Sequence, residues 1–266
     1  MTTVPCFHVD AFTARRFAGN PAAVCLLDKA HPAKWMQAIA AELNLSETAF
    51  VVPMARAFGL RWFTPKCEVD LCGHATLATA HVLWQEGLAP VDVGLQFRTR
   101  SGVLAAVRRG DRIELDFPAR PAVVGKPPKG LAKVLGVTPK LVAHSAEDLL
   151  VELGSEREVR ELQPDLVALA ALPVRGVVVT AASASRRWDF VSRFFAPAVG
   201  VPEDPVTGSA HCVLGPWWSA RLGKLVLTGY QASVRGGEVE VEVVGDRVLL
   251  RGQAVTVVRG ELIEGR

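Results

Sequence analysis

The sequence repeats itself across its midpoint, and this repeat limits the folds that are open to the chain. Residues 61–65 read RWFTP and residues 193–197 read RFFAP, and each stretch leads to a Gly-X-Ala helix start, at Gly73 and at Gly208. The two arginines are 132 positions apart and the two glycines 135. Because each spacing is about half of the 266 residues, the simplest interpretation is a duplicated unit of roughly 130 residues, the size of one domain.

A third match supports two lobes, because residues 107–115 resemble residues 243–250. The stretch 118–130 is rich in Pro, Gly and Ala and has neither helical nor strand periodicity, which favours a boundary there. We therefore predict a first lobe over 1–118, completed by a C-terminal strand at 255–266, and a second lobe over 119–254.

Within each lobe the pattern predicts strands around one long helix. Residues 94–100, 102–108 and 112–117 alternate apolar and polar side chains across short turns, as an antiparallel meander does. Apolar helices are expected at 74–86 and 209–221. An amphipathic helix that ends near Asn44 and a further helix at 160–170 are also expected. The predicted fold is α+β, with two pseudo-symmetric lobes, each a mostly antiparallel sheet wrapped around a central helix.

Composition excludes several classes of function. Thirty basic and 27 acidic residues are scattered along the chain and give a net charge of +3, so a nucleic-acid partner is not indicated. No segment has the roughly 18 apolar residues that a membrane span needs, and the N-terminus lacks a signal-peptide pattern, so we expect a cytoplasmic protein without a membrane partner. Five cysteines in unpaired spacing suit reduced thiols.

One cluster of residues has the composition of a metal site. Cys67, Cys72 and His74 follow a C-x4-C-x-H pattern. No second cluster completes four ligands at zinc spacing, so no metal is predicted.

The two helix starts are candidate anion sites. Free backbone N–H groups in a first turn, together with the helix dipole, favour an anion, and Gly73 and Gly208 would let it approach closely. If the lobes face each other, both starts would point into one cleft suited to a small carboxylate. The alternative is that both motifs only cap helices.

Glu47 is the candidate proton carrier. It stands at the entrance of an expected strand in an apolar stretch, where loss of solvent would raise its pKa and allow proton transfer near neutral pH. The alternative is a solvated turn. The positions 132 and 135 residues further on hold Val179 and Ala182, which are not acids, so any catalysis is asymmetric.

Two acids and two histidines stand near the helix starts. Asp70 and Asp204 precede them and are either dipole partners or substrate contacts. His74 directly follows a glycine and is well placed to face a ligand, whereas His211 lies further into its helix and is expected to pack or cap.

Several motifs together resemble those of the phenazine-biosynthesis (PhzF-like) isomerase family. In chain order they are residues 17–21 (FAGNP), 45–48 (LSET), 63–76 (FTP through CGHAT) and 203–210 (EDPVTGSA). The family shares the diaminopimelate epimerase fold, with the active site between two lobes.

This resemblance implies a cofactor-independent isomerase in which Glu47 moves a proton on a small carboxylate-bearing substrate. It implies binding roles for Gly73, His74, Asp204, Gly208 and Ser209, with Asn20, Asp70 and Cys72 as further candidates. It also implies a homodimer.

Two alternatives remain open at this stage. One is a thiol-based epimerase that uses Cys72, as in related epimerases with two thiols. We expect the corresponding position of the second lobe at Asp204 or its neighbours, which offer no second thiol. The other is a non-catalytic metabolite-binding or interaction protein that retains the fold.

Overall fold

The computed structural model describes residues 3–263. The chain divides into two compact units, of which unit 1 holds residues 3–116 and 251–263 and unit 2 holds Phe117–Leu250. Residues 264–266 of the expected closing strand lie outside the described residues. Within residues 3–263, none of the helices combines the length and the apolar character that crossing a membrane requires.

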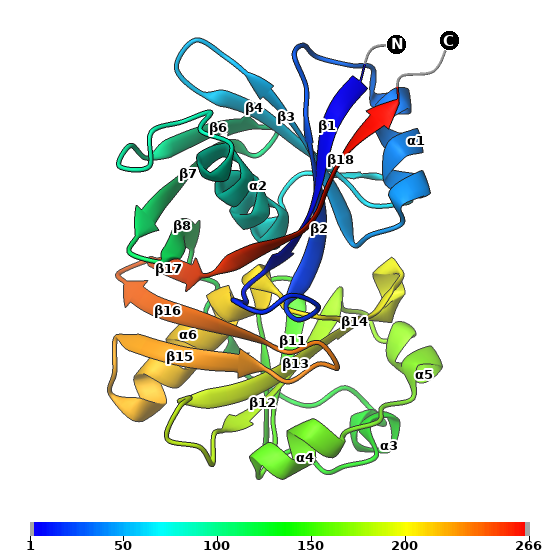
Figure 1. The fold of residues 1–266 in the computed structure, drawn as a ribbon. Helices are drawn as coiled ribbons and strands as arrows, with labels where there is room; N and C mark the ends of the chain where they lie inside the picture. The colour runs from blue at the N-terminus through cyan, green and yellow to red at the C-terminus, as the bar shows by residue number, and fades with distance from the viewer. Residues whose placement is uncertain (1–2, 264–266) are drawn as a thin grey trace. The chain divides into compact units, whose positions relative to one another are not determined.

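Unit 1 is built from strands that alternate with two helices (Figure 1). The elements are β1 (Thr3–Ala11), β2 (Asn20–Leu26), α1 (Ala33–Leu43), β3 (Glu47–Pro53), β4 (Phe58–Phe63), β5 (Glu68–Val69), α2 (Gly73–Gln85), β6 (Leu95–Thr99), β7 (Gly102–Arg109), β8 (Arg112–Pro118) and β18 (Ala254–Ile263). Neighbouring strands pair in the order β18, β1, β2, β3, β4, β6, β7, β8, with β5 also on β4. Only β2–β3 and β4–β6 are parallel among these pairs.

Unit 2 repeats this arrangement. Its elements are β9 (Val123–Val124), α3 (Leu131–Leu135), β10 (Leu141–His144), β11 (Asp148–Glu152), α4 (Glu156–Glu161), α5 (Leu166–Ala170), β12 (Gly176–Ala182), β13 (Phe190–Ala196), η1 (Pro197–Val199), β14 (Val201–Asp204), α6 (Gly208–Leu222), β15 (Val226–Gln231), β16 (Gly237–Val244) and β17 (Arg247–Gly252). The pairing order β9, β10, β11, β12, β13, β15, β16, with β14 on β13, matches the first seven strands of the unit 1 order, β18 to β7, where β5 lies on β4. The parallel pairs, β11–β12 and β13–β15, stand at the equivalent places.

The duplication and the α+β fold class predicted from the sequence are therefore confirmed. A central helix, α2 in unit 1 and α6 in unit 2, follows the short strand β5 or β14 in each copy (Figure 1). In unit 1, α2 packs against β1, β2, β3, β7 and β18, and nearly all of its side chains are buried.

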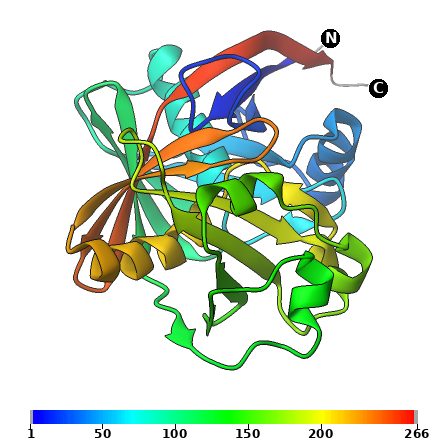
Figure 2. The ribbon, with the colours of Figure 1, turned by 90° about the horizontal axis from the view of Figure 1, so that it is seen from below.

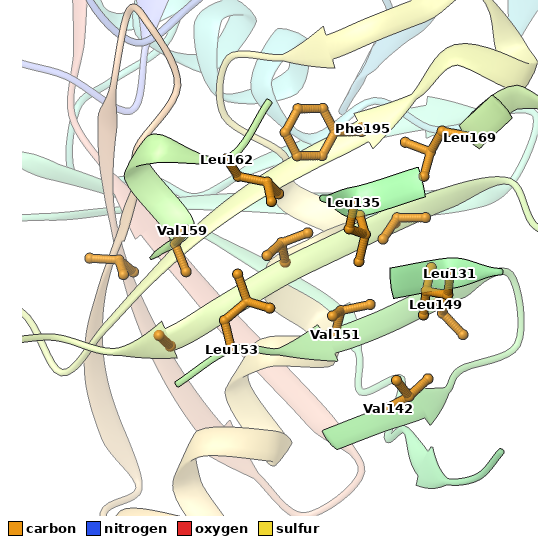
Figure 3. Packing of buried hydrophobic residues seen from close by; sticks show 14 residues of the cluster. Leu131, Leu135, Val142, Leu149, Val151, Leu153, Val159, Leu162, Leu169 and Phe195 are labelled. Atoms are coloured by element: carbon orange, nitrogen blue, oxygen red, sulfur yellow. The ribbon is translucent and has the colours of Figure 1, made fainter. Parts of the chain in front are cut away.

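The sheet of unit 2 is covered on both faces. Successive side chains of a strand point to opposite sides, so each strand contributes side chains to both faces. One face packs on the short helices α3, α4 and α5, seen as green turns in Figure 2, and forms an apolar cluster (Figure 3). The strand residues in it alternate, as in Leu149, Val151 and Leu153. The other face meets α6, where the indole Nε1 of Trp218 donates to Oγ1 of Thr180 at 3.0 Å.

A proline lies inside α6 without ending it. Pro216 has no N–H, so the carbonyl of Cys212 four residues earlier loses its helical donor. The backbone N–H of Arg120 takes that place and donates to the Cys212 oxygen at 2.9 Å. The segment that leads into unit 2 thus compensates for the proline in its central helix.

The helix expected over 160–170 is wrong, because two short helices stand there instead. Helix α4 ends at Glu161 and α5 begins at Leu166, on either side of Pro164. A proline disfavours helical backbone in the residue before it and cannot donate to the preceding turn. Asp165 then starts the second helix, because its carboxylate accepts from the N–H groups of Val167 and Ala168.

Candidate active site at the start of the central helix

Strand alternation places Glu47 on the face of unit 1 that meets α2. Phe50, on the same strand, packs in the cluster with Met36 of α1, which marks the α1 face. Glu47 is three residues from Phe50 and therefore points the other way. On neighbouring β2, Cys25 belongs to the α1 face, so Asn20 points toward α2 as well.

A tight turn holds Asn20 at the start of β2. Gly19 has a φ of +66°, and a Cβ built there would lie 2.2 Å from the carbonyl oxygen of Ala11, so only glycine fits. The N–H of Phe17 donates to the buried carboxylate of Asp10 at 2.7 Å. The FAGNP motif is thus a structural device that fixes the position of the asparagine side chain.

His74 occupies the first turn of α2. Cys72 is the residue before the helix, in extended backbone, and its carbonyl accepts from Oγ1 of Thr76 at 2.5 Å. This places the His74 ring, which is 5% exposed, beside the strand residues Glu47 and Asn20.

The side chains of Glu47, Asn20 and Cys72 surround the His74 ring, and all of these residues are buried except Glu47, which is partly exposed. Nε2 of the ring lies 3.1 Å from Oε2 of Glu47, while Nδ1 lies 3.3 Å from Nδ2 of Asn20 and 3.5 Å from Sγ of Cys72. An N–H of the ring faces the carboxylate both in the neutral ring with its proton on Nε2 and in the charged ring, which carries a proton on each nitrogen. Neither Glu47 Oε2 nor His74 Nε2 has an aligned hydrogen-bond partner within residues 3–263, although both are buried.

The surroundings shift the pKa of two of these groups. Burial alone would lower the pKa of His74, but the Cys72 sulfur and the Glu47 carboxylate beside the ring outweigh it and raise that pKa well above its ordinary value. Burial raises the pKa of the Cys72 thiol, and the charge of Glu47 adds to this. The cluster therefore favours a charged imidazole and a protonated thiol.

Glu47, Cys72 and His74 are also residue types that bind metals, and their ligand atoms lie within 4.8 Å of one another. The ring, however, presents Nε2 to the carboxylate and Nδ1 to the sulfur. A metal held by one ring nitrogen lies about 2 Å beyond it, away from the group on the other nitrogen. The arrangement fits proton exchange better than a three-ligand metal centre.

Cys67 and Asp70 do not join this cluster. Cys67 is exposed, and its carbonyl accepts from the hydroxyl of Thr64 at 3.1 Å. Asp70 has a side chain that is 68% exposed and pairs with Arg100 at 3.2 Å. The C-x4-C-x-H pattern is therefore not one site.

The start of α6 holds a second group of polar side chains, in unit 2. Oγ1 of Thr207 donates to Oδ2 of Asp204 at 2.5 Å. Gln231, at the end of β15, accepts from the N–H of Thr207 at 2.9 Å and donates to the carbonyl of Asp204 at 2.7 Å. These bonds fix the loop in front of Gly208.

Ser209 is held by a charged neighbour. Its Oγ accepts from Nη2 of Arg175 at 3.1 Å, and the same guanidinium pairs with the buried carboxylate of Asp148. Because the lone pairs of Oγ face Arg175, its proton remains available to an acceptor. Sequence reasoning missed Arg175 and Gln231, since both come from strands or loops far along the chain and stand in no motif.

Equivalent residues of the two units can be assigned from strand register. Phe50 pairs with Arg61, and Val179 pairs with Arg193, the equivalent arginine. Counting back three residues on each strand makes Gly176 the position in unit 2 that is equivalent to Glu47. The expected counterparts Val179 and Ala182 are therefore wrong, and the counterpart that the register gives, Gly176, is not an acid either.

The glycine at that place leaves no room for a side chain. A Cβ on Gly176 would lie 2.4 Å from the ring of Phe194. At the helix starts, Cys72 precedes Gly73 as Thr207 precedes Gly208. The counterpart of Cys72 is thus Thr207 rather than Asp204, and this position holds a thiol in unit 1 only.

His211 is a packing residue, as expected. It is fully buried, and its Nδ1 lies 2.8 Å from the carbonyl of Thr207, so Nδ1 carries the proton of the neutral ring. Burial lowers the pKa of His211 to about 4. Its bond to the residue before the helix repeats the bond from Thr76 to Cys72 in unit 1.

Comparison with known proteins identifies the family. Residues 9–260 match the family described as phenazine biosynthesis-like protein (PhzC-PhzF). The chain belongs to this family. A protein of Halalkalibacterium halodurans named as an uncharacterized isomerase is 50% identical over 99% of this chain and 100% of its own length. The sequence-based assignment to this isomerase family is confirmed.

Solved structures agree on the fold. A PhzF family protein from Enterococcus faecalis has a TM-score of 0.95 and 42% identity, covering 99% of this chain and 100% of that chain. A hydroxyproline epimerase from Agrobacterium vitis has a TM-score of 0.64 at 12% identity, with 98% and 92% covered, which shows the fold alone.

Proposed function

We propose that this protein is a cofactor-independent isomerase that moves a proton on a small carboxylate-bearing substrate, with Glu47 as the proton carrier. The observation that carries the proposal is the 3.1 Å approach of Glu47 Oε2 to His74 Nε2 at the start of α2. Both atoms are buried, and neither has an aligned partner within residues 3–263. A substrate group would supply the missing hydrogen bonds, since buried polar atoms are rarely left without them.

In this proposal the carboxylate of Glu47 takes a proton from an acidic carbon and returns it to the substrate. His74 donates from Nε2 and stabilises negative charge that develops beside it, and its raised pKa keeps it charged for that role. Asn20 and Cys72 flank Nδ1 and hold the ring in place. Gly73 would leave room for the substrate at the helix start.

The second set of proposed binding residues lies at the start of α6. Gly208 and Ser209 offer first-turn donors, and the Ser209 hydroxyl, with its oxygen facing Arg175, would donate to a carboxylate. Asp204, whose side chain accepts from Thr207, would bind an amine or hydroxyl. The family resemblance also supports a homodimer, and sedimentation velocity at micromolar concentration would test it.

A deuterium-exchange screen tests the reaction. The protein is incubated in D2O with a panel of cyclic and linear amino and hydroxy acids, and exchange is followed by NMR. The proposal expects deuterium to enter at least one compound, and that compound gives both the substrate and the site of proton transfer. If acids bind by calorimetry but none exchanges, a non-catalytic binding protein is the better interpretation.

A further inference from the structure

Two buried cysteines face each other across a strand pair in unit 1, away from the candidate site. Cys6 of β1 and Cys25 of β2 are direct partners in an antiparallel register. Their sulfurs lie 3.7 Å apart, and their residues are 7% and 0% exposed. Both belong to the apolar cluster on the α1 face, with Met36 and Phe50.

The geometry of this pair allows a covalent bond. Directly opposed residues in antiparallel strands have Cα atoms about 4.5 or 5.5 Å apart, and disulfides span about 4.4 to 6.8 Å between Cα atoms. Closing the sulfurs to about 2.05 Å therefore needs side-chain rotation rather than strand movement. We propose that Cys6 and Cys25 are a modification site that forms a reversible disulfide when the protein meets a small peroxide.

The reaction balances with hydrogen peroxide as the oxidant. The Cys6 thiolate attacks one peroxide oxygen, an S–O bond forms, the O–O bond breaks, and the departing hydroxide takes a proton to become water. The Cys25 thiolate then attacks the Cys6 sulfur, an S–S bond forms and the S–O bond breaks. The second hydroxide takes the proton that Cys25 has lost, so two thiols and one peroxide give one disulfide and two waters.

The other cysteines lack such a partner. Within residues 3–263, Cys67, Cys72 and Cys212 have no second cysteine sulfur in hydrogen-bond contact. The thiol of Cys25 donates to Cys6 and lowers the pKa of Cys6, which favours the attacking thiolate. Burial instead raises the pKa of Cys72, and that of Cys212 to about 12.

Peptide mapping tests the proposal. The folded protein is treated with a few equivalents of hydrogen peroxide. It is then unfolded in the presence of iodoacetamide, which alkylates the free thiols, and digested with trypsin without reduction. Cleavage after Arg15, Arg16 and Lys29 separates Cys6 from Cys25. The proposal expects peptides 1–15 and 17–29 to appear joined, with two hydrogen atoms lost, and to separate on addition of dithiothreitol.

Matched variants complete the experiment. Cys6→Ala and Cys25→Ala should each abolish the joined peptides, whereas Cys212→Ala, which removes another buried sulfur, should retain them. The oxidised wild type should melt a few degrees higher than the reduced form, because the bond closes the loop between the strands in the unfolded chain. The proposal is overturned if Cys6 and Cys25 stay alkylatable at a peroxide dose that oxidises exposed Cys67, or if Cys6 ends as sulfinic acid. The peptide map of the wild-type protein tests the proposal even if a variant fails to fold.

Discussion

Oε2 of Glu47 and Nε2 of His74 lie 3.1 Å apart, although one residue begins a strand and the other stands in the first turn of the next long helix. The contact arises because Glu47 is on the α2 face of β3 and the helix starts at Gly73, directly beside that strand end. The unit 2 position equivalent to Glu47 is Gly176, so unit 2 has no counterpart of the Glu47–His74 pair.

The first prediction concerns the proton carrier. Glu47→Gln keeps the size of the side chain but cannot exchange a proton, so deuterium exchange into the substrate should fall by about 10² to 10⁴. Glu42→Gln, which makes the same change at an exposed position of α1, should leave the rate unchanged. A Glu47→Gln variant with wild-type exchange would remove the basis of the proposed function.

The second prediction separates the acid from the thiol. Cys72→Ser should retain most of the exchange, since burial raises the pKa of that thiol and its counterpart in unit 2 is Thr207, which cannot act as a second thiol. The measurement is the same NMR assay at matched protein concentration. If Cys72→Ser is inactive while Glu47→Gln is active, the thiol-based epimerase is correct.

The third prediction is the pH dependence of stability through His74. Because its pKa is raised in the folded state, its contribution to the free energy of unfolding is fully present below the unfolded value near 6.5 and is lost as the pH rises through the folded pKa. The stability difference between wild type and His74→Gln should therefore shrink from pH 6 toward alkaline pH, by urea unfolding. A difference that grows with pH would contradict the assigned shift.

The fourth prediction is the opposite behaviour of His211. Its pKa is lowered to about 4, so the unfolded chain binds the proton first, and the folded state loses stability as the pH falls from about 6.5 to 4. The loss should approach about 3 kcal/mol at the acid end of that window. His211→Gln should show a smaller loss over the same range, and NMR titration should find the ring neutral at pH 6.

The fifth prediction compares two equivalent ion pairs. Arg61 binds Glu68 and Arg193 binds Glu203, each through two nitrogens, in front of the central helices. The Arg61 side chain is 36% exposed and that of Arg193 is 12% exposed. Arg193 also donates to the carbonyl of Leu162 at the end of α4.

Removing the more buried partner should cost more. Arg193→Ala should lower the free energy of unfolding by about 2 to 4 kcal/mol, because it leaves a half-buried carboxylate and a carbonyl unpaired. Arg61→Ala should cost about 1 kcal/mol or less, since Arg61 is the more exposed arginine and Glu68 keeps a second partner in Arg100 at 3.1 Å. Chemical unfolding of both variants gives the comparison, and equal losses would count against burial as the cause.

Local sequence signals predicted the secondary structure where one type of signal dominated. The helix expected to end near Asn44 ends at Leu43, with Asn44 in the left-handed conformation. The meander of β6, β7 and β8 follows the alternation of apolar and polar residues. The pattern failed at 160–170, where an apolar periodicity runs across Pro164 and the backbone constraint of the proline prevails.

The sequence by itself determined the duplication and the fold class and indicated Glu47 as the candidate proton carrier, because repeats, periodicity and motifs are all local properties of the chain. Only the tertiary structure decided which side chains meet. Strand register showed that Gly176 is the unit 2 equivalent of Glu47. Packing brought Arg175 to Ser209 and Gln231 to Thr207. Such contacts join distant elements through the pairing and packing of whole strands, and no local pattern carries that information.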